Sequence, residues 1–148
     1  MKVTEDSYAE QPALEWLGEA GWDYLSGTTL APDLAPQERS TARDVVLRET
    51  LTGAITRLNP DLPADAVTRV VELAMTGSHP EVIRDHQSFH QLLLEGVPID
   101  WLDGDGIDRS GRATLVDFDN PDRNEFTAVN QLSIEGGGKV VRRPDVLL

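Results

Sequence analysis

The chain ends in Arg142-Arg143-Pro144-Asp145-Val146-Leu147-Leu148, and this stretch decides the interpretation of the second half of the sequence. A carboxylate placed directly after a proline opens a short apolar run, which is the pattern of a strand with an acid at its start. Similar strand-like runs stand at residues 97–102, 113–118, 126–134 and 140–148, with Gly, Asp and Asn clusters between them. We therefore predict a sheet over residues 97–148, with short connections that favour antiparallel pairing.

A helix is predicted near the amino terminus. Ser7 and Glu10 have the spacing of a capping box, and apolar residues recur at helical intervals as far as Gly21. The prediction covers residues 7–20. Because Pro12 is tolerated only in the first turn, the regular helix is expected to begin closer to Glu10. A brief strand around Trp22 should follow, and then a loop rich in Thr, Asp and Pro.

Three further helices are predicted between residues 39 and 96. The first ends at Asn59-Pro60, the second begins near Pro63, and the third closes at Gly96. The expected organisation is a first helix, strand and loop over 1–38, a helical insertion over 39–96 and a sheet over 97–148. This corresponds to an α/β chain of the α+β kind, within one domain of 148 residues.

The cysteine content, the length of the apolar runs and the net charge each exclude a class of function or site. The chain has no cysteine, so disulfides and thiolate chemistry are excluded. No apolar run approaches the length of a membrane-spanning helix, and we expect a soluble, cytoplasmic protein with no membrane partner. The 13 basic and 26 acidic residues give a net charge of −13, which argues against a nonspecific nucleic-acid surface. Any contact with DNA must be local or supplied by other domains, and Lys139, Arg142 and Arg143 gather near the carboxyl terminus.

Three stretches of the sequence superficially resemble a zinc site, a calcium-binding loop and a phosphate-binding loop, but each lacks residues that such a site needs. His79, His86 and His90 could share a helix face, but they lack the neighbouring glutamate of a zinc protease motif. Residues 103–114 depart from a calcium-binding loop at three required positions, and a hairpin turn is predicted there. Residues 136–139 are followed by Val140 where a phosphate-binding loop needs Ser or Thr, and Ser133 stands where the loop needs its first glycine, so a flexible turn is predicted instead.

Asp145 is the candidate for chemistry. A carboxylate set by a proline at the start of an apolar strand is how metal-dependent nucleases present their first metal ligand, because magnesium prefers hard oxygen ligands. Arg142 and Arg143 would place positive charge near an attacked phosphate. The Pro-Asp pair alone is a weak signal, since it also occurs at Pro32-Asp33, Pro60-Asp61 and Pro121-Asp122.

Several blocks of the sequence, taken together, strengthen this signal. They resemble, in the same order, the opening of the motor subunits of type I restriction endonucleases, and they extend over essentially the whole chain. The blocks are residues 4–17 with Gly21-Trp22, 58–63, 89–93, 95–98, 116–121, 124–126, 129–131 and 142–145.

The resemblance implies a nuclease fold of the PD-(D/E)xK type, a restriction-endonuclease-like mixed sheet with an amino-terminal helix and a helical insertion. In such a fold, Asp145 would be the strand aspartate and Glu10 the helical glutamate, both catalytic and both ligands of Mg²⁺. Glu10 could equally be only the capping-box residue, or serve both roles. Arg142 and Arg143 would contact DNA or form a solvated strand end.

The family pattern continues with an acidic-x-Lys pair on the next strand, and no such pair follows Asp145 in these 148 residues. We therefore expect a nuclease domain truncated before that strand, and a chain that does not cut DNA by itself. The resemblance further implies a parent protein with ATP-driven motor domains that binds double-stranded DNA. That parent would assemble with modification and specificity subunits.

Two other functions remain open. An acidic chain could be a non-enzymatic docking module or a DNA mimic that occupies a DNA-binding groove. The acids here are scattered among caps and turns, however, and mimicry needs a regular carboxylate stripe. A degenerate nuclease domain kept for assembly is the other alternative.

Overall fold

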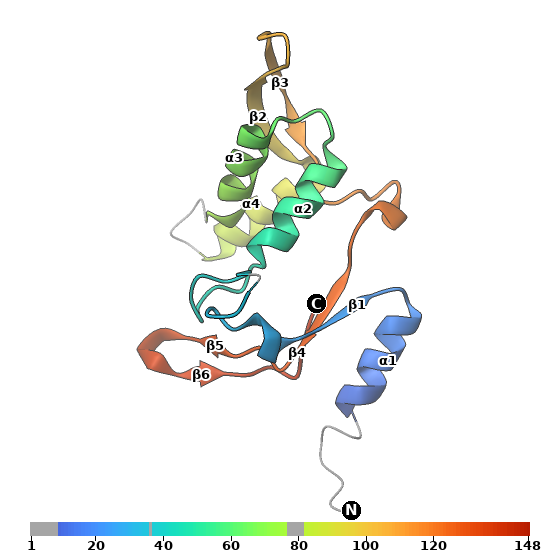
Figure 1. Cartoon of the computed structure of the whole chain (residues 1–148), viewed down its shortest axis with the longest axis vertical. Helices are drawn as coiled ribbons and strands as arrows, with labels where there is room; N and C mark the ends of the chain where they lie inside the picture. Colours follow the sequence, from blue (N-terminus) through green and yellow to red (C-terminus); the bar gives the residue numbers. More distant parts are fainter. Residues whose placement is uncertain (1–8, 36, 77–81) are drawn as a thin grey trace, which may run out of the picture. The chain divides into compact units, whose positions relative to one another are not determined.

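The computed structural model describes residues 9–35, 37–76 and 82–148. The chain forms two compact units, which Figure 1 shows in sequence colours. The terminal unit comprises Met1–Leu47 and Glu125–Leu148, and the central unit comprises Arg48–Asn124. The chain thus leaves the terminal unit after Leu47 and returns to it at Glu125.

A mixed three-stranded sheet organises the terminal unit. Its strands are β1 (Asp23–Ser26), β4 (Thr127–Asn130) and β7 (Val146–Leu147), in the order β1-β4-β7. β1 pairs with β4 in parallel, and β7 pairs with β4 antiparallel. Helix α1 (Gln11–Glu19) leads into β1 (Figure 1). Helices combined with a mixed sheet confirm the predicted α+β class.

Helix α1 confirms the predicted amino-terminal helix over its described part. The regular helix follows Glu10, and Pro12 stands in its first turn, where its missing N–H is not needed. Gly21, with φ of 89°, follows the helix in a left-handed conformation that glycine adopts without steric cost. Ser7, the other half of the expected capping box, lies outside the described residues.

The core of the terminal unit lies on one face of this sheet. Leu30, Val129 and Leu132 are buried together, and Leu25 and Leu147 pack against them. Because side chains alternate along a strand, Asn130 faces the side opposite to Val129. The sheet therefore has an apolar face and a face that carries polar side chains.

The close approach of Gly27 and the hydrogen bonds of Arg39 hold the segment after β4 in place. Gly27 opens the short 3₁₀ helix η2 (Gly27–Leu30), and a Cβ placed there would lie 2.5 Å from the backbone of Asn130 and Leu132. Only glycine permits so close an approach. Arg39 is almost fully buried, and its guanidinium donates to four backbone carbonyls, including that of Ser133 at 3.0 Å.

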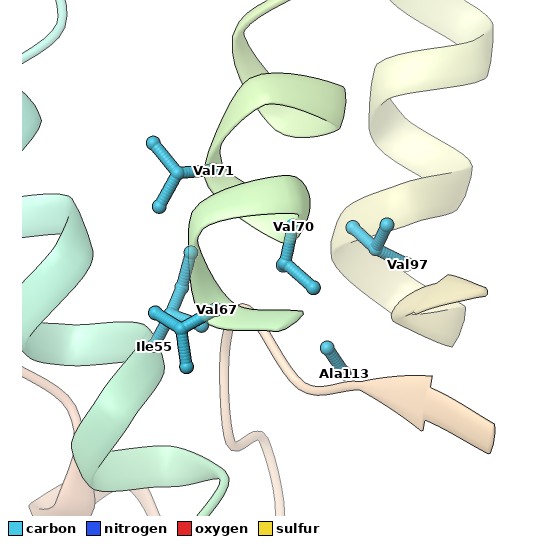
Figure 2. Packing of buried hydrophobic residues seen from close by; sticks show 6 residues of the cluster. All are labelled: Ile55, Val67, Val70, Val71, Val97 and Ala113. Atoms are coloured by element: carbon cyan, nitrogen blue, oxygen red, sulfur yellow. The ribbon is translucent and has the colours of Figure 1, made fainter. Parts of the chain in front are cut away.

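The central unit packs three helices against a hairpin. These elements are α2 (Arg48–Leu58), α3 (Ala64–Met75), α4 (Val82–Glu95), β2 (Val97–Leu102) and β3 (Asp108–Ala113). Figure 2 shows valines of α3 between Ile55 of α2 and the hairpin residues Val97 and Ala113. All three predicted helices are present, and Gly96, with φ of 81°, follows α4 as expected.

The predicted sheet over residues 97–148 is wrong as a single unit. The β2–β3 hairpin buries Val97 and Ala113 in the helical core, so it belongs with residues of the expected insertion. The remaining strands divide between the terminal sheet and a separate small hairpin of β5 (Ile134–Glu135) and β6 (Val141–Arg142). The apolar residues Val97 and Ala113 are thus buried against helices rather than against a larger sheet.

Two of the predicted strands are also misplaced. The strand expected at 113–118 is β3, which ends where that run begins, because the Asn59 side chain bonds both backbone groups of Thr114. The run 126–134 is interrupted at Gln131, whose φ is 52°. Short 3₁₀ helices, η3 (Pro121–Arg123) and η4 (Gly137–Lys139), occupy two of the connections.

Candidate metal centre

One side-chain amide joins the two acids singled out by the sequence. Nε2 of Gln131 donates to Oε2 of Glu10 at 2.8 Å and to Oδ1 of Asp145 at 3.2 Å. Glu10 precedes the first helix and Asp145 precedes the last strand, 135 positions later in the sequence. The fold thus places one oxygen of each carboxylate within 3.2 Å of the same nitrogen atom.

Glu10 is the buried member of the pair, with 5% of its surface exposed. Its Oε1 accepts a hydrogen bond from Nδ2 of Asn130 at 2.7 Å. The amide of Asn130 is itself oriented by Tyr24, whose hydroxyl donates to Oδ1 at 2.8 Å. A carboxylate removed from water needs such donors, because burial of an uncompensated charge is costly. The polar face of the β1–β4 pair supplies them.

Asp145 is the exposed member of the pair. Its backbone carbonyl accepts from the N–H of Gln131 at 3.1 Å, which continues the antiparallel pairing of β4 with β7 by one residue. Residues directly opposite in such a pair have adjacent side chains. This cross-strand position brings the Asp145 carboxylate to the Gln131 amide.

Arg142 and Arg143 lie in the residues just before Asp145. Both are exposed, Arg142 at the end of β6 and Arg143 directly after it. In the described parts of the chain neither guanidinium pairs with a carboxylate. They remain accessible cations in the same terminal unit as the carboxylate pair.

Tyr24, Asn130 and Gln131 were not predicted from the sequence as parts of this arrangement. A signal for two of them was present, since two consecutive amides end the apolar run of β4 and belong to one of the blocks on which the resemblance rests. Their contacts reach across 106 to 121 positions of the sequence, and no local periodicity reports pairing at that range.

The rejected motifs occur where ordinary structure explains them. His86 and His90 are exposed on α4, and His79 lies outside the described residues. Residues 136–139 form the turn between β5 and β6. No group of three or more His, Cys, Asp or Glu side chains that could hold a metal occurs among residues 9–35, 37–76 and 82–148.

Residues 103–107 form the turn of the β2–β3 hairpin, as predicted. Asp103 accepts from the backbone N–H of Ile107 at 2.9 Å and from Nε of Arg109 at 2.8 Å. These bonds stabilise the ionised carboxylate and hold the pKa of Asp103 below its ordinary value of 3.8. The acid serves to close a turn.

No helix in the described part of the chain is both long and apolar enough to cross a membrane.

Comparisons with known proteins point to one family. Residues 2–148 match the family model described as the type I restriction enzyme R protein N terminus. A type I restriction enzyme HindI endonuclease subunit of Haemophilus influenzae is 36% identical over 140 residues, which is 93% of this chain and 13% of that protein. A protein of Methanocaldococcus jannaschii assigned as the MjaIXP type I restriction enzyme endonuclease subunit is 29% identical over 150 residues, which is 99% of this chain and 14% of its own length.

The chain therefore spans only about an eighth to a seventh of the length of these curated relatives, 13% and 14%. The family model, in contrast, covers nearly the whole chain. Its match also extends over all the blocks that the sequence analysis singled out. This chain belongs to the family of type I restriction enzyme R protein N termini.

Proposed function

We propose that this chain is the amino-terminal part of the DNA-cleaving domain of a type I restriction endonuclease subunit, with Glu10 and Asp145 as two ligands of one Mg²⁺ ion. The observation that carries the proposal is the shared contact of both carboxylates with Nε2 of Gln131. Two acids far apart in sequence meet at one point, and the named relatives are endonuclease subunits. The mixed β1-β4-β7 sheet next to α1 supports a fold of the PD-(D/E)xK type.

The donor set suits magnesium. Both acids offer carboxylate oxygens, the hard ligands that magnesium prefers, and magnesium commonly uses only one or two carboxylates and keeps several waters. When bound, the ion supplies positive charge that stabilises the phosphate under attack. Glu10, held by the Asn130 amide, would set the position of the site, and the exposed Asp145 would open it to solvent and substrate.

Arg142 and Arg143 are proposed to contact the DNA backbone near the cut. Both side chains are exposed, and guanidinium groups bind phosphate oxygens through charge-assisted hydrogen bonds. The net charge of −13 repels DNA from most of the surface, so these residues would act locally. The main grip on double-stranded DNA would come from other domains or subunits.

The proposed partner subunits and the use of ATP are inferred from the family to which the chain belongs. The parent protein is proposed to act in the cytoplasm with modification and specificity subunits, and to use ATP in motor domains outside these 148 residues. Translocation by such domains would bring distant DNA to the nuclease. Residues 136–139, the stretch that superficially resembles a phosphate-binding loop, form a turn between two short strands.

The 148-residue chain alone is expected not to cleave DNA. The PD-(D/E)xK pattern requires an acidic-x-Lys pair, and Asp145 is followed here by Val146, Leu147 and Leu148. A lysine is what would orient the attacking water in that pattern. Supercoiled plasmid incubated with the chain and Mg²⁺ should stay intact. Reproducible nicking that disappears in Asp145→Ala would contradict this expectation.

The function itself is tested in the whole endonuclease subunit, assembled with its partner subunits. Asp145→Asn should reduce DNA cleavage by at least about a hundredfold, since even outer-shell changes at metal sites cost about 10–100-fold. ATP hydrolysis should continue, because the motor is separate. Asp23→Asn is the matched control, an exposed acid on β1 of the same unit. Undiminished cleavage by the Asp145→Asn enzyme would refute the proposed function.

A further inference from the structure

The amide of Gln131 occupies a distinctive position between two negative charges. Its Nε2 lies 2.8 Å from an oxygen of Glu10 and 3.2 Å from an oxygen of Asp145, with the N–H groups directed at both. Two carboxylates that share one site repel each other, and each loses hydration when it is drawn toward the other. The positive end of the amide dipole offsets that repulsion.

The backbone brings Gln131 to this position. Residue 131 follows the last paired residue of β4, opposite Asp145, and its φ of 52° is a conformation that non-glycine residues adopt rarely. The Asn130 side chain is tied on both sides, to Tyr24 and to Glu10. The Gln131 side chain, in contrast, is held through the two acids and has three torsions, the last of which is broad.

We infer that Gln131 is a placeholder for the cation: its amide holds the two carboxylates together when no metal is bound and swings away when a divalent ion binds between them. This inference rests on the proposed metal site. Nε2 lies between one oxygen of Glu10 and one oxygen of Asp145. A Mg²⁺ ion bound to both of these oxygens, at about 2.1 Å from each, would need the position that the amide now occupies, so the amide has to leave.

If the Gln131 amide must leave before the cation binds, removing the amide should raise the affinity for Mg²⁺. Gln131→Met keeps the length of the side chain and removes the amide. If the amide bonds exist only in the metal-free protein, their loss destabilises that state and leaves the metal-bound state unchanged. Linkage then requires the variant to bind the cation more tightly than the wild type. A residue with a merely structural role, or one that ligates the metal, would have the opposite effect or none.

The test follows the side-chain amides of the 148-residue chain by ¹H–¹⁵N NMR during titration with MgCl₂. The Gln131 amide, assigned by its absence in Gln131→Met, should move toward the position of a free glutamine amide and exchange faster with water. The amide of Asn59, which donates to Ile55 and Thr114 in the central unit, should not move. Calorimetry on Gln131→Met should give Mg²⁺ binding on the order of tenfold tighter than wild type, the scale of one hydrogen bond to a charged group.

Gln37→Met is the matched control. Gln37 is exposed in the same unit and donates to a backbone carbonyl, that of Pro32 at 3.1 Å, so its loss should leave Mg²⁺ affinity unchanged.

Failure of the Gln131 role and failure of the proposed metal site would give different results in these experiments. If the wild type binds Mg²⁺ and Asp145→Asn does not, while the Gln131 amide stays in place or Gln131→Met binds more weakly, the placeholder role is overturned and the metal site stands. If the wild type binds no Mg²⁺ at all, the proposed site fails and the inference fails with it.

Discussion

Asp103 holds the turn of the β2–β3 hairpin through bonds to the Ile107 N–H and to Arg109. Its pKa is lowered in the folded protein, so its charged form stabilises the hairpin at any pH above about 3.8, the ordinary value. That stabilisation is lost as the pH falls below 3.8 and through the lower pKa of the folded state. The effect belongs to an exposed turn and should be local.

A ¹³C titration of the Asp103 carboxyl group should therefore have its midpoint below 3.8, the ordinary value. Arg109→Gln should move that midpoint upward, because it removes a charged donor from the carboxylate. A wild-type midpoint at or above the ordinary value would show that these bonds do not form in solution.

The candidate site was only partly predictable from single residues. Glu10 and Asp145 were singled out by the helix start, the Pro-Asp pair and the family resemblance, and the structure brings them to one amide. Their roles as metal ligands stay a prediction. Asn130 and Gln131 could not be assigned, because their contacts depend on the parallel pairing of β1 with β4, which the sequence does not encode locally.

At the scale of elements, the close approach of η2 to the end of β4 supports the site. A side chain at Gly27 would collide with the backbone of Asn130 and Leu132, on either side of Gln131. Gly27→Ala should cost about 1–3 kcal/mol of unfolding free energy, as overpacking does. It should also weaken Mg²⁺ binding, because Asn130, one of the neighbours that must shift, holds the Glu10 carboxylate in place. Urea unfolding and calorimetry measure the two effects.

Gly18→Ala is the control for that substitution. Gly18 is exposed in α1, and a Cβ at this position would meet no atom within 4 Å apart from the neighbouring backbone of its own helix. Alanine should therefore stabilise the helix by about 0.5–1 kcal/mol. Equal stability of the two alanine variants would mean that η2 does not approach β4 as described.

Helices were predicted more accurately than strands, for physical reasons. Helix ends carry local signals, such as Pro63 before α3 and Gly96 after α4, and the structure confirms both. Strand ends depend on residues that are distant in the sequence. β3 ends just before Thr114, whose backbone N–H and C=O are hydrogen-bonded to the Asn59 side chain. The same dependence explains why the hairpin was wrongly grouped with the terminal strands.

For the whole molecule, the division into two units assigns different tasks to different parts of the chain. The central unit has its own apolar core, and the terminal unit carries both acids, both amides and the two exposed arginines. With a net charge of −13, the chain is poorly suited to hold DNA alone, which agrees with the proposal that other domains or subunits supply the grip. The proposed function depends on a cation site within the terminal unit.

Isothermal titration calorimetry of the 148-residue chain with Mg²⁺ measures whether this cation site exists. A single saturable site is expected in the wild type and in Asp23→Asn, and it should be lost in both Glu10→Gln and Asp145→Asn. Binding that survives in the Asp145→Asn chain, or that is absent from the wild type, would rule out a cation site made by these two acids.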